Sequence, residues 1–319
     1  MMTETFSVPL RTRFRGIDVR EGMLLRGDAG WGEFSPFLEY DDPTAAPWLA
    51  AAREAADLGW PAPLRSRIPV NVTVPACDPD RARQIVLDSG GCRTAKVKVA
   101  EPGQGVAADE ARLEAVRDAL GPDGLIRVDA NGGWTFEEAV SRIPLLDRAS
   151  GGLEYIEQPC ASVEDLARVR RRVAVPIAAD ESIRRAADPY RVRDLEAADI
   201  AVLKVQPLGG VRACLRIAED IGLPVVVSSA LETSVGIAAG VALAAALPEL
   251  PYACGLATVQ LLTADVVAAS LLPIDGHLLV ARPDVALDGV GTWGAAVERT
   301  TYWATRLARV ASLGQDQSL

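Results

Sequence analysis

Hydrophobic residues follow two different patterns along the chain. Between residues 6 and 34, short apolar runs alternate with turns that contain glycine, which predicts strands, and a helical stretch follows over residues 44–58. Pro61 and Pro63 then mark a boundary. From Ile68 onward the chain repeats apolar, strand-like runs, and amphipathic helical stretches such as DPDRARQIVLDSG separate the early ones. The two patterns predict two structural units.

The second unit contains eight apolar runs, which are IPVNVTV, TAKVKVA, LIRVDAN, LEYIEQP, VPIAADES, IAVLKVQP, LPVVVSSAL and YACGLAT. A strand, helix, strand order repeated in this way predicts parallel strand pairing. We therefore expect an α/β fold, a TIM-type (βα)8-like barrel over residues 66–270 with an α+β capping domain over residues 1–65. From about Leu271 the pattern breaks into extended chain, and residues 271–319 are expected to return to the cap and complete it.

Composition restricts the partners and the compartment. The chain has 319 residues, a formal net charge of −10 and a pI near 4.8, which argues against binding to nucleic acid or to an anionic membrane. Its five cysteines form no CxxC pair, and the N-terminus has no apolar stretch followed by a cleavage site. The longest apolar segment, residues 235–248, is too short to span a bilayer. We expect a cytoplasmic protein, and its oligomeric state stays open.

Charged residues end five successive strand-like runs. They are Lys98, Asp129, Glu157, Asp180 and Lys204, and the gaps between them are 31, 28, 23 and 24 residues. A (βα)8 barrel of ~250 residues uses about 30 residues per repeat. Each of these side chains is therefore expected to come from its own strand, and all five should meet at the C-terminal mouth of one barrel.

The residue types in this set indicate metal-assisted proton chemistry. Three carboxylates offer the hard oxygen ligands that a divalent cation prefers, and lysines can transfer protons. Lys96 lies two residues before Lys98 and shares its face of the strand, so two ammonium groups point into a barrel interior that is normally apolar. Such repulsion destabilises a fold unless anions or a function compensate for it.

The order of these motifs resembles that of the enolase superfamily. KxK, DxN, E-Q-P, D-E-S and a later strand lysine match its muconate-lactonising subgroup, over nearly the whole chain. The resemblance implies Mg²⁺, for which Mn²⁺ can substitute, bound by Asp129, Glu157 and Asp180, and a small-molecule carboxylate as substrate. It implies that Lys98 is the base, and that Lys204 is either the second acid/base, as in racemases, or a stabilising cation, as in dehydrating members.

Three more residues lie beside the expected site. Asn131 and Glu181 adjoin the metal-ligand positions, and we expect them to support the ligands rather than bind the metal. Arg127 shares a face of its strand with Asp129. It could anchor a substrate carboxylate or brace the lysines, and the sequence leaves both interpretations open.

Two segments resemble those of one particular group within the superfamily. VVVSSALETSVG and CGLAT are similar to the corresponding segments of o-succinylbenzoate synthases, in which the loop after the seventh strand receives the succinyl tail. Ser228 and Ser229 could hold the carboxylate of that tail, or could only cap the next helix. Dipeptide epimerases of the subgroup typically carry an Asp-x-Asp near the eighth strand that binds an α-amino group. The GLAT segment has no acidic residue, so the resemblance disfavours a cationic substrate.

This resemblance implies a lyase of menaquinone biosynthesis. The expected reaction is the syn-dehydration of 2-succinyl-6-hydroxy-2,4-cyclohexadiene-1-carboxylate to 2-succinylbenzoate. Two alternatives are an N-succinylamino-acid racemase and a non-catalytic binding scaffold. GWGEFSPF, residues 30–37, resembles a mobile loop that closes over the substrate, with Trp31, Phe34 and Phe37 available to exclude water. The alternative is a hairpin and turn packed on the core of the cap, which we expect for Trp31.

Overall fold

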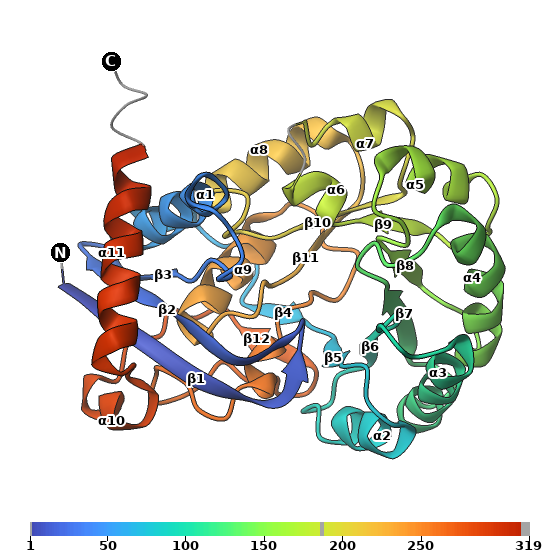
Figure 1. Ribbon diagram of the computed structural model, residues 1–319, viewed down its shortest axis with the longest axis horizontal. Helices are drawn as coiled ribbons and strands as arrows, with labels where there is room; N and C mark the ends of the chain where they lie inside the picture. The colour runs from blue at the N-terminus through green and yellow to red at the C-terminus, as the bar shows by residue number, and fades with distance from the viewer. Residues whose placement is uncertain (1, 186–187, 314–319) are drawn as a thin grey trace.

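The computed structural model describes residues 2–185 and 188–313, which form a barrel and a cap beside it (Figure 1). The cap begins with a three-stranded antiparallel sheet in the order β1-β2-β3, followed by an α-helix that continues as a short π-helix. These elements are β1 (Met2–Phe14), β2 (Ile17–Gly27), β3 (Gly30–Phe34), α1 (Asp42–Arg53) and η1 (Glu54–Leu58). The β1–β2 turn places Arg15 and Gly16 at positive φ.

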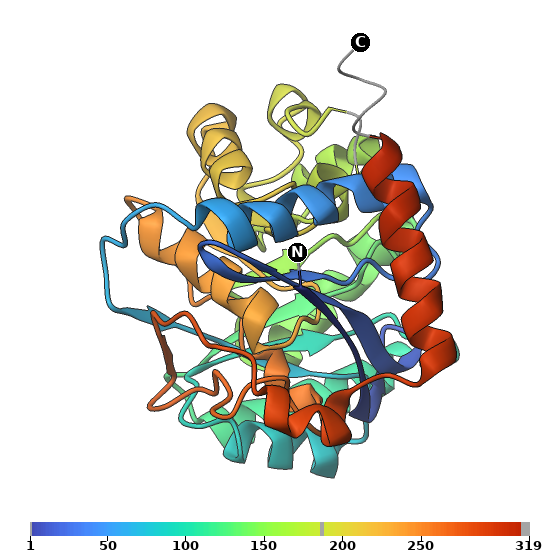
Figure 2. The same ribbon diagram turned by 90° about the vertical axis from the view of Figure 1, so that its left-hand side faces the viewer.

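The C-terminal helix α11 (Val297–Leu313) also belongs to the cap. It crosses beside α1 in Figure 2, and both helices contribute to one apolar cluster. Trp48 of α1 and Trp303 of α11 are buried in this cluster, and the ring of Trp303 packs edge-to-face against Phe34 at 6.1 Å between centroids. The C-terminal part of the chain therefore returns to the N-terminal cap, and it packs there as a helix.

The barrel is built from a seven-stranded parallel sheet in the order β11-β10-β9-β8-β7-β6-β5. Its strands are β5 (Val72–Val74), β6 (Thr94–Lys98), β7 (Leu125–Asp129), β8 (Tyr155–Glu157), β9 (Ile177–Ala179), β10 (Ile200–Leu203) and β11 (Val225–Val227). Single bridges close the gap, because Cys254 pairs with Val70 and Gly255 pairs with Ser228. The eighth apolar run thus completes the ring without forming a regular strand.

Helices cover the outside of the sheet. They are α2 (Pro79–Leu87), α3 (Val106–Leu120), α4 (Phe136–Ser150), α5 (Val163–Arg170), α6 (Glu181–Arg184), α7 (Arg191–Asp194), α8 (Val211–Ile221) and α9 (Ser234–Ala246). The apolar segment noted in the sequence is α9, which is buried along nearly its whole length. In the described chain, no helix is both long and apolar enough to span a membrane.

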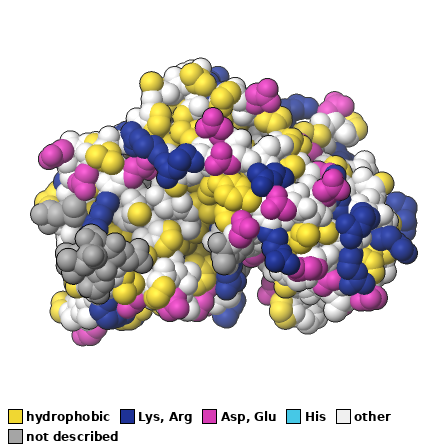
Figure 3. All heavy atoms as spheres, turned by 90° about the horizontal axis from the view of Figure 1, so that it is seen from above, with side chains coloured by type: hydrophobic (Ala, Val, Ile, Leu, Met, Phe, Trp, Pro, Cys, Tyr) yellow, Lys and Arg dark blue, Asp and Glu magenta, His cyan; other side chains and the backbone are white. Residues whose placement is uncertain are grey.

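The remaining elements join the two units. They are β4 (Arg67–Pro69), β12 (His277–Leu279), the 3-10 turns η2 (Thr258–Leu261) and η3 (Leu287–Gly289), and α10 (Val290–Trp293). The first apolar run is therefore split, because β4 pairs with β12 in an antiparallel ladder and only β5 enters the barrel. On the face shown in Figure 3, acidic and basic side chains are interspersed.

The expected fold class, a (βα)8-like barrel with an α+β cap, is confirmed. Two details of the prediction are wrong. Extended chain was expected over PIDGHLLVARPDVALDGVG, residues 273–291, but η3 and the start of α10 lie at the end of this stretch; a full eighth strand was expected, but only bridges form. The precise limits of the two domains stay a prediction.

Candidate active site

The carboxyl ends of consecutive barrel strands position the five charged residues that the sequence singles out. Lys98, Asp129 and Glu157 are the last residues of β6, β7 and β8, and they are direct neighbours in register. Asp180 follows β9 and Lys204 follows β10. Because parallel strands all end at the same side of the sheet, the five side chains meet at one mouth, as the spacing predicted.

Ammonium and carboxylate groups alternate within this cluster. Lys96 Nζ lies 3.1 Å from Glu157 Oε2 and 3.6 Å from Asp129 Oδ2. Lys98 Nζ lies 2.5 Å from Asp129 Oδ2, and Lys204 Nζ lies 2.7 Å from Asp180 Oδ2. The three carboxylate residues are completely buried. Contacts of this length between buried, opposite charges hold each lysine in one position.

Burial and mutual charge shift the protonation of the cluster. Burial raises the pKa of Glu157 to about 7, and the nearby Asp129 adds to the shift, against the opposing effect of Lys96. Burial also acts to raise the pKa of Asp129, but Lys98 and Lys96 outweigh it and hold that pKa at about 2. For Lys96, burial acts to lower the pKa, but Glu157 and Asp129 raise it well above the ordinary value. Asp129 is therefore a permanent anion and Lys96 a permanent cation at neutral pH.

The donor set suits a hard divalent cation. Three carboxylates from neighbouring positions of the ring offer only oxygen, the ligand type that Mg²⁺ prefers. Burial and like-charge repulsion at Glu157 are relieved by added positive charge. Within residues 2–185 and 188–313, no group of three His, Cys, Asp or Glu side chains has a geometry that could hold a metal ion. The three carboxylates at the mouth contact lysines instead.

Arg184 is a member of the cluster that sequence reasoning missed. Its Nε lies 2.8 Å from Asp180 Oδ1, its Nη2 lies 2.6 Å from Glu181 Oε1, and its Nη1 donates to the hydroxyl of Tyr40 in the cap. The signal was present, because Arg184 follows Asp180 by four residues and Glu181 by three on α6, which places the side chains on one helix face. Arg184 therefore links an expected metal ligand to the cap.

Asn131 and Glu181 both lie at the mouth beside the acids. The backbone N–H of Asn131 donates to Asp129 Oδ1 at 2.9 Å, and its side-chain oxygen accepts from Lys98 Nζ at 2.6 Å. Its amide nitrogen donates to Glu181 Oε1 at 3.2 Å. Asn131 thus holds the acid and the lysine in a fixed relation, and it does so at a positive φ of 46°.

Arg127 does not reach the mouth. Its guanidinium donates to Glu154 Oε2 at 2.7 Å and to the carbonyl oxygen of Ala253 at 2.7 Å, and it also contacts Asn71 and Tyr155. It is completely buried. Neither predicted role, anchoring a substrate carboxylate or bracing the lysines, fits these contacts, and we now interpret Arg127 as a structural residue of the barrel interior.

Ser228 and Ser229 lie at the mouth, directly after β11. The hydroxyl of Ser228 accepts from Lys96 Nζ at 3.4 Å, and the hydroxyl of Ser229 is 2.7 Å from that of Thr258. Helix α9 begins five residues later, and Thr233 is its N-cap. The alternative that the serine pair only caps a helix is therefore wrong.

A pocket between cap and barrel gives access to the cluster. The cap contributes aromatic and basic side chains, and the barrel contributes the lysines and small polar groups. Its lining residues are Phe14, Arg15, Phe37, Thr73, Lys96, Lys98, Asn131, Arg184, Lys204, Ser228, Ser229, Ala230, Leu231, Gly255 and Thr258.

The cap elements over the mouth differ from those expected. Residues 30–34 form β3, and Trp31 and Phe34 are buried, so the core packing expected for Trp31 is confirmed and the predicted mobile loop is wrong for residues 30–34. Phe37 does line the mouth. The β1–β2 turn faces it there, with the guanidinium of Arg15 3.8 Å from the Phe37 ring centroid and Lys98 Nζ 5.5 Å from the Phe14 ring centroid.

A buried ion network joins the cap to the mouth loop, residues 228–233. Glu33 of β3 accepts from the backbone N–H and hydroxyl of Thr233 and from the N–H of Gly236, at the start of α9. Arg20 of β2 donates to the carbonyl oxygen of Leu231 at 2.8 Å. Both residues are buried. The cap therefore fixes the loop that presents Ser228 and Ser229.

Glu33→Gln is expected to make protein stability less dependent on pH. Burial raises the pKa of Glu33 from 4.5 to about 7, with Arg20 opposing and Glu232 adding to the shift. The folded state therefore binds this proton more tightly than the unfolded state, and Glu33 lowers stability as pH rises from about 5 to 7, by an amount of order 3 kcal/mol. Denaturant unfolding across this range measures it, and an equal pH dependence in both proteins contradicts the assignment.

Comparison with known proteins places this site in a family. Residues 79–293 match the family described as "Enolase C-terminal domain-like", and residues 5–56 match "Enolase N-terminal domain-like". The o-succinylbenzoate synthase of Thermobifida fusca is 69% identical over 90% of this chain and 89% of its own length. That of Mycolicibacterium smegmatis is 53% identical over 96% of this chain and 94% of its own length.

Solved structures agree on the fold. A muconate lactonizing enzyme from Pseudomonas fluorescens has a TM-score of 0.79 at 23% identity, over 92% of this chain and 98% of its own. The L-Ala-D/L-Glu epimerase from Bacillus subtilis has a TM-score of 0.76 at 24% identity, over 90% of this chain and 98% of its own. Together with the matches along the sequence, these findings show that the chain belongs to the enolase superfamily and, within it, to the o-succinylbenzoate synthases.

Proposed function

We propose that this protein is the lyase that converts 2-succinyl-6-hydroxy-2,4-cyclohexadiene-1-carboxylate to 2-succinylbenzoate by syn-dehydration, in menaquinone biosynthesis. One observation carries the proposal: Lys98 and Lys204 each contact one of the buried carboxylates at a single mouth. The relatives with the same activity in their names, 69% and 53% identical, support it.

Lys98 is the residue that moves the proton. In its neutral form it takes the proton α to the ring carboxylate, and the electron pair of that C–H bond moves into the carboxylate. The C–O bond then breaks, and the departing hydroxide takes the proton back from Lys98 and leaves as water. Asp129 and Asn131 hold Nζ at 2.5 and 2.6 Å, so that one nitrogen can serve both steps on one face of the ring.

Asp129, Glu157 and Asp180 would hold the Mg²⁺ that this family implies, and Mn²⁺ can substitute for it. When bound, the metal supplies positive charge that stabilises the carboxylate as negative charge develops on it. Lys96 remains charged and in contact with Glu157, so its ammonium group balances the negative charge of that carboxylate. Asn131 and Glu181 support the ligands from the side.

The walls of the mouth suit an anionic, partly apolar substrate. Phe14, Phe37 and Leu231 provide apolar surface that excludes water from the ring. The hydroxyls of Ser228 and Ser229 offer donors for a carboxylate of the tail. The direct test is the production of 2-succinylbenzoate from the cyclohexadiene substrate with added Mg²⁺, and absence of product with a folded protein would refute the function.

An N-succinylamino-acid racemase is the second candidate, because two lysines face one mouth. A two-base racemase needs a proton donor on each side of the α-carbon, and Lys204, four strands after the KxK strand, could be the second. An N-succinylamino acid incubated in D₂O would gain deuterium at its α-carbon if this activity is present. A protein that binds Mg²⁺ and succinyl compounds without any turnover would instead be a binding scaffold.

Lys204→Arg is expected to retain part of the dehydration activity and to lose racemisation. Arginine keeps the positive charge beside Asp180 but cannot give up its proton, so it can stabilise an anion but cannot act as a base. Parallel assays of 2-succinylbenzoate formation and of deuterium incorporation separate the two roles. Equal retention of both activities would show that Lys204 is not the second acid/base.

The compartment is part of the proposal. The five cysteines are free thiols, four of them buried, as is common in a reducing environment. We propose a cytoplasmic enzyme whose partner is its small carboxylate substrate, with no nucleic acid or membrane involved.

A further inference from the structure

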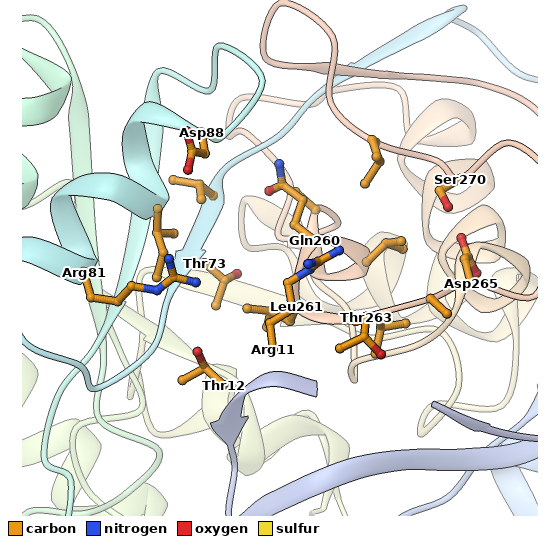
Figure 4. Close-up of a pocket in the computed structure, with 17 residues that line it drawn as sticks. Arg11, Thr12, Thr73, Arg81, Asp88, Gln260, Leu261, Thr263, Asp265 and Ser270 are labelled. Carbon is orange, nitrogen blue, oxygen red and sulfur yellow. The ribbon is translucent and has the colours of Figure 1, made fainter. Parts of the chain in front are cut away.

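A second hollow of about 490 Å³ lies beside the mouth, between cap and barrel (Figure 4). Strand β1 supplies Arg11 and Thr12, β5 supplies Thr73, α2 supplies Arg81, and the chain after the eighth apolar run supplies Gln260. No catalytic role has been assigned to any of these five residues. We call this hollow the side groove.

Among the residues that the structure describes, the two arginines of the side groove are unpaired. Neither Arg11 nor Arg81 has a salt bridge or a side-chain hydrogen bond within the described part of the chain. In Figure 4 the side chain of Arg81 extends toward Thr73, and that of Arg11 points in the direction of Gln260. The carboxylates of the groove already have donors, since Asp88 accepts from Gln84 and Asp265 accepts from Ser234. The guanidinium groups are therefore available to an anion.

Thr73 connects the side groove with the mouth. It lines both hollows and is paired in register with Lys96. Its residue is only 4% exposed, and its hydroxyl has no hydrogen-bond partner among the described residues. A buried hydroxyl without a partner destabilises a protein, typically by about 1–3 kcal/mol. A ligand oxygen that reaches this point from either hollow would remove that cost.

The net charge of the protein gives the side groove a function in attracting an anionic substrate. The chain carries a formal charge of −10, so as a whole it repels the dicarboxylate substrate that we propose for it. Arg11 and Arg81 offer two positive charges next to the mouth that no described side chain pairs with, and positive charge beside a site raises the rate at which anions arrive.

We propose that the side groove is a docking site for the dicarboxylate, in which Arg11 and Arg81 attract a carboxylate and the Thr73 hydroxyl donates to it as the ligand enters the mouth. The proposal rests on the proposed function, since it names the route of that substrate. It assigns the arginines to association and leaves the chemical step to the lysines.

The test replaces the arginines without touching the mouth. Arg11→Gln with Arg81→Gln is expected to lower kcat/KM about tenfold in about 10 mM salt, where the Debye length is about 30 Å, and to leave kcat unchanged. The difference should disappear in high salt. Arg83→Gln is the matched control for Arg81→Gln alone, because each removes one positive charge from an exposed position of the same helix and Arg83 lies outside the groove. An Arg81→Gln variant or a double variant that behaves like Arg83→Gln overturns the proposal.

Thr73→Val tests the contact between the two hollows. It is expected to raise KM several-fold while the midpoint of thermal unfolding stays equal or rises, because the hydroxyl has no partner to lose in the free protein. A purely structural threonine would show the reverse, with lower stability and an unchanged KM.

A separate measurement distinguishes failure of this proposal from failure of the proposed function. The association rate of 2-succinylbenzoate, followed by stopped flow, requires no turnover. If the wild-type protein does not dehydrate the cyclohexadiene but binds 2-succinylbenzoate more slowly after the arginine changes, the function is wrong and the side groove stands. If turnover occurs and the association rate is the same in both proteins, the side groove is wrong and the function stands.

Discussion

Lys98→Ala is expected to lower kcat for dehydration by about 10²–10⁴-fold, the usual contribution of a positioned general base. The reason is geometric, because Lys98 Nζ is held at 2.5 Å from Asp129 and 2.6 Å from Asn131, at the end of β6 and facing the mouth. Substrate binding should survive, since the other lining residues stay in place. Formation of 2-succinylbenzoate measures kcat, and titration with that product measures binding.

Lys98→Arg separates the charge from the proton transfer. Arginine restores a cation beside Asp129, yet it does not become neutral at working pH and cannot accept the α-proton. We expect it to be as inactive as the alanine variant and closer to the wild-type protein in stability. If either variant kept most of the wild-type kcat, Lys98 would not be the base.

Asp180→Asn is expected to lower activity by more than about 100-fold and to abolish stabilisation of the protein by Mg²⁺. Asp180 is completely buried, and its carboxylate lies 2.8 Å from Arg184 and 2.7 Å from Lys204. Neighbouring cations hold the pKa of this carboxyl well below its usual range, against the effect of burial. The neutral amide removes a charge from both the expected metal site and the ion network.

Asp180→Asn also affects folding, which needs its own control. Leaving two buried cations without their anion costs about 3–5 kcal/mol. Adding Lys204→Gln to the variant restores the balance of charge, so stability should recover in part while activity stays lost. Thermal unfolding with and without Mg²⁺, beside the dehydration assay, measures both. Full activity of the Asp180→Asn variant would show that Asp180 is not a metal ligand.

Local features of the chain were enough to predict the architecture and the centre of the site. TAKVKVA, LIRVDAN and LEYIEQP each predict an apolar strand that carries a charged residue toward its end, and the structure has strands within these runs, over 94–98, 125–129 and 155–157. Parallel strands end at one side of a barrel whatever the remaining sequence, so Lys98, Asp129 and Glu157 had to meet. Arg184 was also accessible, through its helical spacing from Asp180.

Contacts between distant segments were not accessible in this way. Arg127 points to the same face of its strand as the last residue of that strand, but it lies two residues earlier and therefore deeper in the barrel. There Glu154 and the carbonyl oxygen of Ala253 accept its hydrogen bonds. Residues 30–34 contain two aromatic residues and three polar or glycine positions, and nothing local indicates that α11, more than 250 residues later, packs against Phe34.

By itself, the sequence determined the order of strands and helices, the residue that ends each strand, and hence the triad of carboxylates with lysines around it. These follow from local periodicity and from the geometry of a parallel barrel. Only the tertiary structure decided which groups surround the mouth. They are the turn with Phe14 and Arg15, the buried ion network in which Glu33 accepts from Thr233, and the side groove with Arg11 and Arg81. Each depends on how the cap docks on the barrel, and docking is set by packing between residues far apart in the chain.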